Sequence, residues 1–258
     1  MSDATSPIQG LQTTSSIFIT GYARTFGLFG KLSRAQLLVP FTFLAGEAKV
    51  NGKDTTGART GFADARFRFG INLLGSPAIG IAEFQRFKEE TVLGVSFVVS
   101  VPMGQYYSEK LINLGTNRWG FKPEIGFSHR QGHWYFEAYT GIWLFTVNNE
   151  FLQVNTLEQE PLFAFQTHVS YLFPSLKWVA LNAGYATGGR SSLNDNQRND
   201  EQRNLRLGAT FSMPLGKRHS VKALLNTGVA TRAGNDYTAF TLAYQYTWFK
   251  KPVAPQKL

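Results

Sequence analysis

The stretch that most constrains the fold is the alternating run Tyr237 to Phe249, YTAFTLAYQYTWF. Small or polar residues there are separated by large apolar ones at every second position: Phe240, Leu242, Tyr244, Tyr246 and Trp248. A period of two predicts a β-strand with two different faces. One face is apolar and ends in aromatic rings, whereas the other is small and hydrophilic.

The same alternation recurs about ten more times along the chain, with charged residues on the face that is not apolar. The predicted strands cover residues 17–26, 34–45, 62–74, 91–101, 121–128, 134–144, 163–171, 179–185, 205–213 and 221–229. Short connections near residues 30, 130, 174 and 215 alternate with long ones at 46–60, 103–118, 147–160 and 188–204. Strands and connections of this kind are typical of a transmembrane β-barrel. The predicted fold class is therefore all-β, an antiparallel transmembrane barrel.

A soluble lipocalin-like barrel is the competing arrangement, with its apolar residues inside. The polar face of the predicted strands carries Arg, Lys and Glu, paired too irregularly for a packed dry core. The hydrophobic content of 43% and the mean hydropathy of −0.17 exclude a helical membrane bundle. The net charge of +9 comes from basic residues that are mostly single and spaced along strands, so we expect no nucleic-acid partner.

The number of predicted strands bears on where the sequence starts. We count about 11 strands, whereas bacterial single-chain barrels have an even number. Residues 1–16, MSDATSPIQGLQTTSS, also lack the basic and apolar regions of a signal peptide. We therefore expect about 12 strands in the full-length protein, with the sequence beginning downstream of its true start. The alternative is that residues 1–14 form a poor strand, which their composition disfavours.

The expected domains are a polar lead at 1–14, a barrel at 15–249 and a periplasmic tail at 250–258. The segment 81–89 breaks the period and predicts a short amphipathic helix, which could cover part of the periplasmic mouth or form a surface turn.

Five segments carry a resemblance to a known family. They are GYARTFGLFG (21–30), GFADARFRFGINLLGSPA (61–78), PMGQYYSEKLINLGTNRWGFKPEIGFSH (102–129), EAYTGIWLF (137–145) and RLGATFSMPLGKRHSVK (206–222). Over almost the whole chain, the sequence resembles the outer-membrane transporters labelled "meta-pathway of phenol degradation". The resemblance implies a Gram-negative outer membrane and the passage of small molecules, aromatic ones among them. Members carry a signal sequence and one more strand ahead of the first segment, where this chain departs from them.

The polar faces of the strands predict which residues line the pore. The candidates are Arg24, Asp64, Arg66, Arg68, Lys122, Glu124, Tyr135, Glu137, Tyr139, His168, Arg206 and Lys222. Two interpretations stay open: the charges pair to rigidify a narrow barrel, or their basic excess favours small anions such as aromatic or aliphatic carboxylates. Aromatic residues near the predicted strand ends are candidates for interfacial girdles: Trp134, Tyr171, Trp178, Tyr185, Tyr246 and Trp248.

Enzyme motifs are weak in this sequence. Gly52–Gly57 has P-loop spacing but is followed by Ala58, and His168 with Ser170 could only form half of a lipase-like dyad, about 7 Å apart along one strand. The acidic and amide residues of 195–200 lack EF-hand spacing, so a solvated loop is expected there.

The sequence therefore predicts a passive channel for small solutes, with no cofactor, metal or catalytic residue. The alternative is a closed, side-chain-filled barrel with a structural or partner-binding role. The expected partners are membrane lipid, small solutes and the barrel-insertion machinery.

Overall fold

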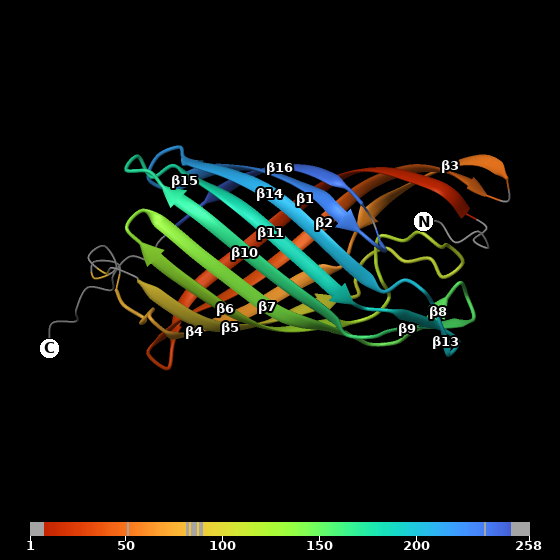
Figure 1. Ribbon diagram of the computed structural model, residues 1–258, viewed down its shortest axis with the longest axis horizontal. Coiled ribbons are helices and arrows are strands. Elements are labelled where there is room, and N and C mark those ends of the chain that lie inside the picture. The colour runs from red at the N-terminus through yellow and green to blue at the C-terminus, as the bar shows by residue number, and fades with distance from the viewer. Residues whose placement is uncertain are drawn as a thin grey trace, which may run out of the picture.

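The computed structural model describes residues 8–50, 52–80, 83, 87, 90–234 and 236–248. A 12-stranded antiparallel sheet curls around a central axis (Figure 1). Its order is β1 (Ile8–Leu28), β2 (Lys31–Val50), β4 (Ala65–Leu74), β5 (Thr91–Val101), β6 (Gly120–Gln131), β7 (Trp134–Phe145), β10 (Leu162–Leu172), β11 (Trp178–Gly188), β14 (Gln202–Pro214), β15 (His219–Thr231) and β16 (Thr238–Tyr246). β3 (Lys53–Phe62) pairs with β2 beside this path. The predicted all-β antiparallel fold is confirmed.

Burial in this sheet is the reverse of burial in a water-soluble barrel. Among the described residues, the buried apolar ones are small in number: Ala65, Val98 and Ala180. Ten buried residues are polar or charged, and Lys122 and Glu124 are among them. Large apolar side chains are exposed on the outer wall instead, as at Ile125, Leu181 and Leu242. The alternation along most strands thus places polar side chains inside and large apolar ones outside.

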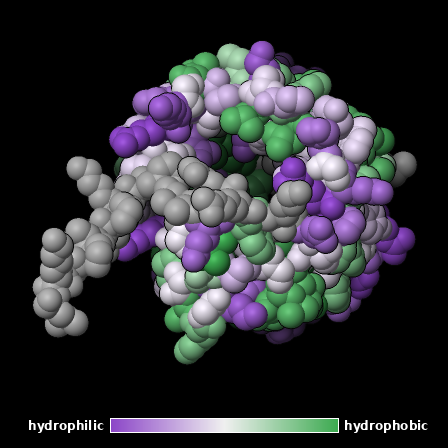
Figure 2. All heavy atoms as spheres, turned by 90° about the vertical axis from the view of Figure 1, so that its left-hand side faces the viewer, coloured by the Kyte–Doolittle hydropathy of each residue, from purple (hydrophilic) through white to green (hydrophobic). Residues whose placement is uncertain are grey.

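The two ends of the barrel differ in their connections. Short turns at one end join β1 to β2, β6 to β7, β10 to β11 and β14 to β15, although the connection from β4 to β5 at this end is longer. At this end the atoms form a ring around a central hollow (Figure 2). The opposite end carries the long connections. Among the described residues, no helix has the length and apolar character needed to span a membrane.

The first three strands extend beyond the rest of the barrel at the long-connection end (Figure 1). β1 pairs with β2 from Ile8 onward, and β2 continues through Val50 into its hairpin with β3. The prediction of a non-strand lead up to residue 14 and of a loop at 46–60 is therefore wrong for the described part of these segments. Backbone pairing between neighbouring strands satisfies the peptide groups whatever the side chains are, so a polar composition did not prevent strand formation.

Two further expected loops contain strands of their own. β8 (Asn148–Phe151), β9 (Asn155–Gln159), β12 (Ser191–Leu193) and β13 (Asn196–Gln197) form a small sheet in the order β13-β12-β9-β8. This sheet joins the connection after β7 to the connection after β11 at the long-connection end (Figure 1). The expected helix at 81–89 lies mostly outside the described residues; Phe87 N–H donates to the Glu83 carbonyl at 2.9 Å.

β1 and β16 are the two edges of the sheet. They run in the same direction, because eleven strands alternate along the path that joins them. The ring of Tyr22 on β1 meets the ring of Trp248, just after β16, with centroids 5.8 Å apart. Both faces of β1 and β16 are largely exposed.

Candidate functional site

A chain of polar contacts crosses the inner wall from β4 to β6. The Glu124 carboxylate accepts hydrogen bonds from the Arg68 guanidinium, from Lys122 Nζ at 2.6 Å and from Ser96 Oγ at 3.1 Å. The Glu124 side chain is 4% exposed, whereas that of Arg68 is 43% exposed. One buried carboxylate thus compensates two cations, and the Arg68 guanidinium still reaches the hollow of the barrel.

The inner wall continues from β7 to β14 through further hydrogen bonds and one ring contact. Tyr139 OH donates to Glu137 Oε1 at 2.9 Å, and the Tyr139 ring lies 5.9 Å from the ring of His168. His168 Nδ1 lies 2.7 Å from Asn182 Oδ1, and Asn182 Nδ2 donates to Thr210 Oγ1 at 2.9 Å. His168 therefore bonds to an amide on the neighbouring strand.

Several inward-facing cations lie over aromatic rings. Arg66 Cζ is 5.7 Å and Lys122 Nζ 5.4 Å from the ring centre of Trp143. Arg206 Cζ is 4.4 Å from that of Tyr237, and Lys222 Nζ is 5.0 Å from that of Trp178. Cations held on ring faces keep their charge while their aliphatic stems cover the wall.

The register places one of the predicted pore-lining residues, Arg24, on the outward face. It also places an inward-facing cation, Arg34, that was not among the predicted pore-lining residues. Arg24 pairs with Ala35, which pairs with Phe69 and, through it, Phe97. Phe97 is exposed on the outer wall, so Arg24 lies on the outward face and not in the interior. Arg34 pairs with Gly70 on the inward face, within electrostatic reach of Lys222. The alternation of the strand at 34–45 carried the signal for Arg34.

Asp64 has a different place from the other candidates. It sits where β3 ends and β4 begins, and its carboxylate accepts hydrogen bonds from Gly104 N–H (3.0 Å), Thr116 N–H (2.9 Å) and Thr116 Oγ1 (2.6 Å). Gly104 and Gly115 touch there, since a Cβ added to Gly104 would lie 2.7 Å from the Gly115 Cα. Asp64 therefore anchors the connection from β5 to β6 across the long-connection end.

Asn148 ties the same connection to the small sheet. Its side chain is almost fully buried, donates to Tyr106 OH at 2.9 Å and accepts from Asn117 Nδ2 at 3.0 Å. Gln159 on β9 contacts Arg118 and donates to the Gly189 carbonyl at 2.8 Å. We call the connection 102–119 and the strands β8, β9, β12 and β13 the loop cap. Sequence reasoning missed this network because its partners are far apart in the chain.

The candidate girdle residues lie at both ends of the strands. Trp134, Tyr246 and Trp248 are exposed at the short-turn end, and Tyr171 packs edge-on against Trp134 with centroids 4.9 Å apart. Tyr185 is exposed nearer the long-connection end. Trp178 differs from the rest: its register partner is buried Ser212, which places it on the inward face with Lys222.

The hydrophilic connection after β11 uses its acidic residues within the protein. Asp200 accepts hydrogen bonds from Ser191 N–H at 2.8 Å and from the Ser191 hydroxyl. Glu201 Oε2 forms ion pairs with the guanidinium nitrogens of Arg232 at 2.8 Å, Arg203 at 3.5 Å and Arg190 at 3.6 Å. The part of the chain that the structure describes contains no group of three or more His, Cys, Asp or Glu arranged to hold a metal ion.

Comparisons with known proteins agree on one kind of relative. A family described as "Putative MetA-pathway of phenol degradation" matches residues 2–246. The crystal structure of an outer membrane channel from Pseudomonas putida F1 superposes with a TM-score of 0.76 at 18% sequence identity, over 92% of this chain and 84% of the other. A search of curated proteins found no match.

Proposed function

Since the chain belongs to the family of the "MetA-pathway of phenol degradation", we propose that it is an outer-membrane channel for passive diffusion of small solutes, with a preference for anions. The similar fold of the Pseudomonas putida channel supports the location and the transport role. The proposal includes no catalytic residue and no cofactor. The barrel-insertion machinery is the partner expected to place it in the membrane.

The observation that carries the anion preference is the imbalance of inward-facing charge. Basic side chains on the inner wall are Arg34, Arg66, Arg68, Lys122, Arg130, Arg206 and Lys222, whereas the acidic ones within the described strands are Glu124 and Glu137. A narrow passage lined by one sign of charge favours counter-ions. The rings of Trp143, Trp178 and Tyr237 lie beside these cations. An aromatic carboxylate would suit this arrangement, because its carboxylate can contact a cation while its ring contacts a neighbouring ring.

The test is the reversal potential across a planar bilayer under a salt gradient. We expect the wild-type protein to show anion preference, and the variant Arg66→Gln, Arg68→Gln, Lys122→Gln, Arg206→Gln to lose it. A matched control removes four positive charges elsewhere, with Lys49→Gln, Lys53→Gln, Lys177→Gln and Lys217→Gln, and should keep the wild-type selectivity. If both variants kept it, the interior cations would not set the preference.

The loop cap favours a second candidate function, a closed barrel with a structural role. Its hydrogen bonds through Asp64 and Asn148 hold several connections together at one end. A closed barrel predicts no conductance for the wild-type protein and a conductance that appears in Asp64→Ala. An open channel predicts conductance in both. Asp54→Ala, on β3 beyond the barrel, removes the same charge as a control.

A further inference from the structure

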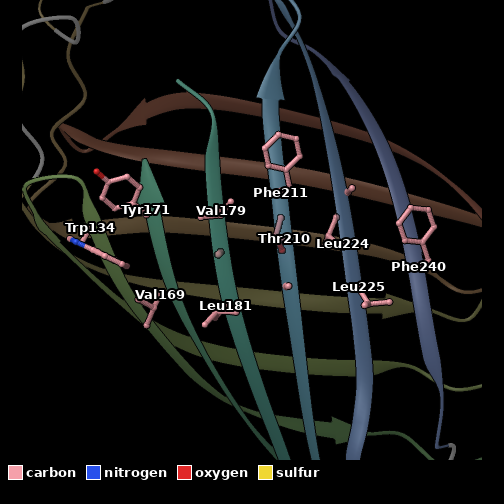
Figure 3. Close-up of a pocket in the computed structure, with 13 residues that line it drawn as sticks. Trp134, Val169, Tyr171, Val179, Leu181, Thr210, Phe211, Leu224, Leu225 and Phe240 are labelled. Carbon is pink, nitrogen blue, oxygen red and sulfur yellow. The ribbon is translucent and has the colours of Figure 1, made fainter. Parts of the chain in front are cut away.

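An apolar groove of about 450 Å³ lies on the outer wall, over strands β7, β10, β11, β14, β15 and β16 (Figure 3). Two rows of outward side chains line most of it, and between them lies the row Ala180, Thr210 and Leu224, which alternates to the opposite face. One row joins Val169, Leu181, Ala209, Leu225 and Phe240 through direct register pairs. The next row joins Trp134, Tyr171, Val179, Phe211 and Ala223 in the same way.

The groove exists because each row contains one small residue among large ones. Ala209 on β14 and Ala223 on β15 are diagonal neighbours, and larger side chains such as Phe211, Leu225 and Phe240 surround them. The two alanines form the floor and the larger side chains form the walls. Such a depression fits a flexible apolar chain better than a flat surface does, because both sides of the chain find contacts.

Charges at the short-turn end suggest what is attached to that chain. The turns that join the groove strands are residues 173–177 and 215–218, and they contain Lys177, Lys217 and Arg218 and no acidic residue. Lys177 precedes Val179 by two residues and Arg218 precedes Ala223 by five, so the basic groups lie about 7 to 17 Å along the strands from the groove. Trp134 and Tyr171, at the groove's end nearest these turns, are residue types favoured at a membrane interface.

We propose that this outer wall binds one anionic phospholipid, with an acyl chain in the groove and its phosphate beside Lys177 and Lys217. The inference rests on the membrane location proposed above but not on conduction. A second copy of the chain is the less suitable occupant, because a two-fold contact at this wall would set the same basic turns against each other. The site is separate from the interior, because the groove faces outward.

Native mass spectrometry of the full chain, released from detergent with phosphatidylglycerol or phosphatidylcholine of identical acyl chains, tests the site. We expect a discrete one-to-one complex that favours phosphatidylglycerol. Lys177→Gln with Lys217→Gln should weaken phosphatidylglycerol binding about twenty-fivefold, since each lysine near an anionic headgroup contributes about fivefold. The charge-matched control Lys31→Gln with Lys53→Gln should leave it unchanged.

A second pair of variants tests the groove itself. Ala209→Leu with Ala223→Leu fills the floor and should abolish the complex with either lipid, whereas Ala183→Leu, also outward on β11 but not lining the groove, should not. The heat-dependent mobility of the barrel in SDS gels verifies that each variant folds, and its conductance reports separately on the channel. Equal binding of the two lipids, unchanged binding after the groove is filled, or protein dimers in place of lipid complexes would each overturn the proposal.

Discussion

At the residue scale, Glu124 is the position where interior charge and structure are most directly linked. Its buried carboxylate balances Lys122 and Arg68 at once. Removing one member of such a group leaves the remaining charges without compensation, and this costs more than the pair itself contributes. The interior is partly open to water, which reduces the cost relative to a dry core.

We predict that Glu124→Gln increases the anion preference in bilayer recordings and lowers the free energy of unfolding by about 2 kcal/mol in urea titrations. Glu137→Gln is the matched control, because it removes the same inward charge from a carboxylate whose described partner is the neutral Tyr139 hydroxyl. It should change selectivity in the same direction with a smaller loss of stability. Equal losses in the two variants would mean that the contacts of Glu124 with Lys122 and Arg68 add no stability beyond that of a single hydrogen bond.

At the scale of a single strand, the face on which a residue lies should decide what a charge does. Phe165 and Gln166 are neighbours in the middle of β10, and they point outward and inward respectively. In a bilayer, we expect Phe165→Arg to destabilise the barrel by about 2 to 4 kcal/mol, because the guanidinium would face hydrocarbon. Gln166→Arg should cost less than about 1 kcal/mol. Reversible unfolding from lipid vesicles measures both, and similar values would contradict the assigned faces.

The connection after β11 gives a prediction about pH. The hydrogen bond from Arg232 and the charges of Arg203 and Arg190 lower the pKa of Glu201 below its ordinary range. A group whose folded pKa is depressed stabilises the fold above its unfolded pKa of about 4.3 and loses that effect as the pH falls through the folded value.

The amide hydrogen-exchange rates of residues 190–203, corrected for the intrinsic rate, should therefore stay constant from pH 8 to pH 5, because the Glu201 carboxylate stays ionised over this range. The exchange should accelerate only at more acidic pH. Glu201→Gln should exchange faster than the wild type from pH 8 to pH 5. If the wild-type connection loosened between pH 7 and 5, another group would control it.

Elements were predictable from the sequence to the extent that their side chains alternate. Strands such as β7 and β14 were identifiable because one face of each is almost entirely apolar. The strand at Ile8–Thr14 and the β2–β3 hairpin were not, since their pairing depends on backbone hydrogen bonds between polar segments. Trp178 shows the same limit at one residue: an aromatic ring near a strand end suggested the outer surface, and only the register with Ser212 placed it inside.

At the scale of the whole molecule, the two ends have different structures, which implies an orientation. The loop cap and the long N-terminal strands occupy one end, and the short turns occupy the other (Figure 1). Barrels of this class place long connections outside the cell and short turns in the periplasm. The loop cap could not be predicted from periodicity, because Asp64, Asn148 and their partners come from different connections.

The absence of cysteine from the sequence makes the orientation directly measurable. We predict that Asn194→Cys, exposed in the turn between β12 and β13, reacts with a membrane-impermeant maleimide on intact cells that carry the protein in their outer membrane. Ser175→Cys, exposed in the turn between β10 and β11, should react only after the outer membrane is broken. The wild-type protein, which has no thiol, controls for other reactions of the reagent. Labelling of Ser175→Cys alone on intact cells would show that the barrel has the opposite orientation. The basic turns beside the groove would then face the outer leaflet, and not the phospholipid leaflet that the lipid site requires.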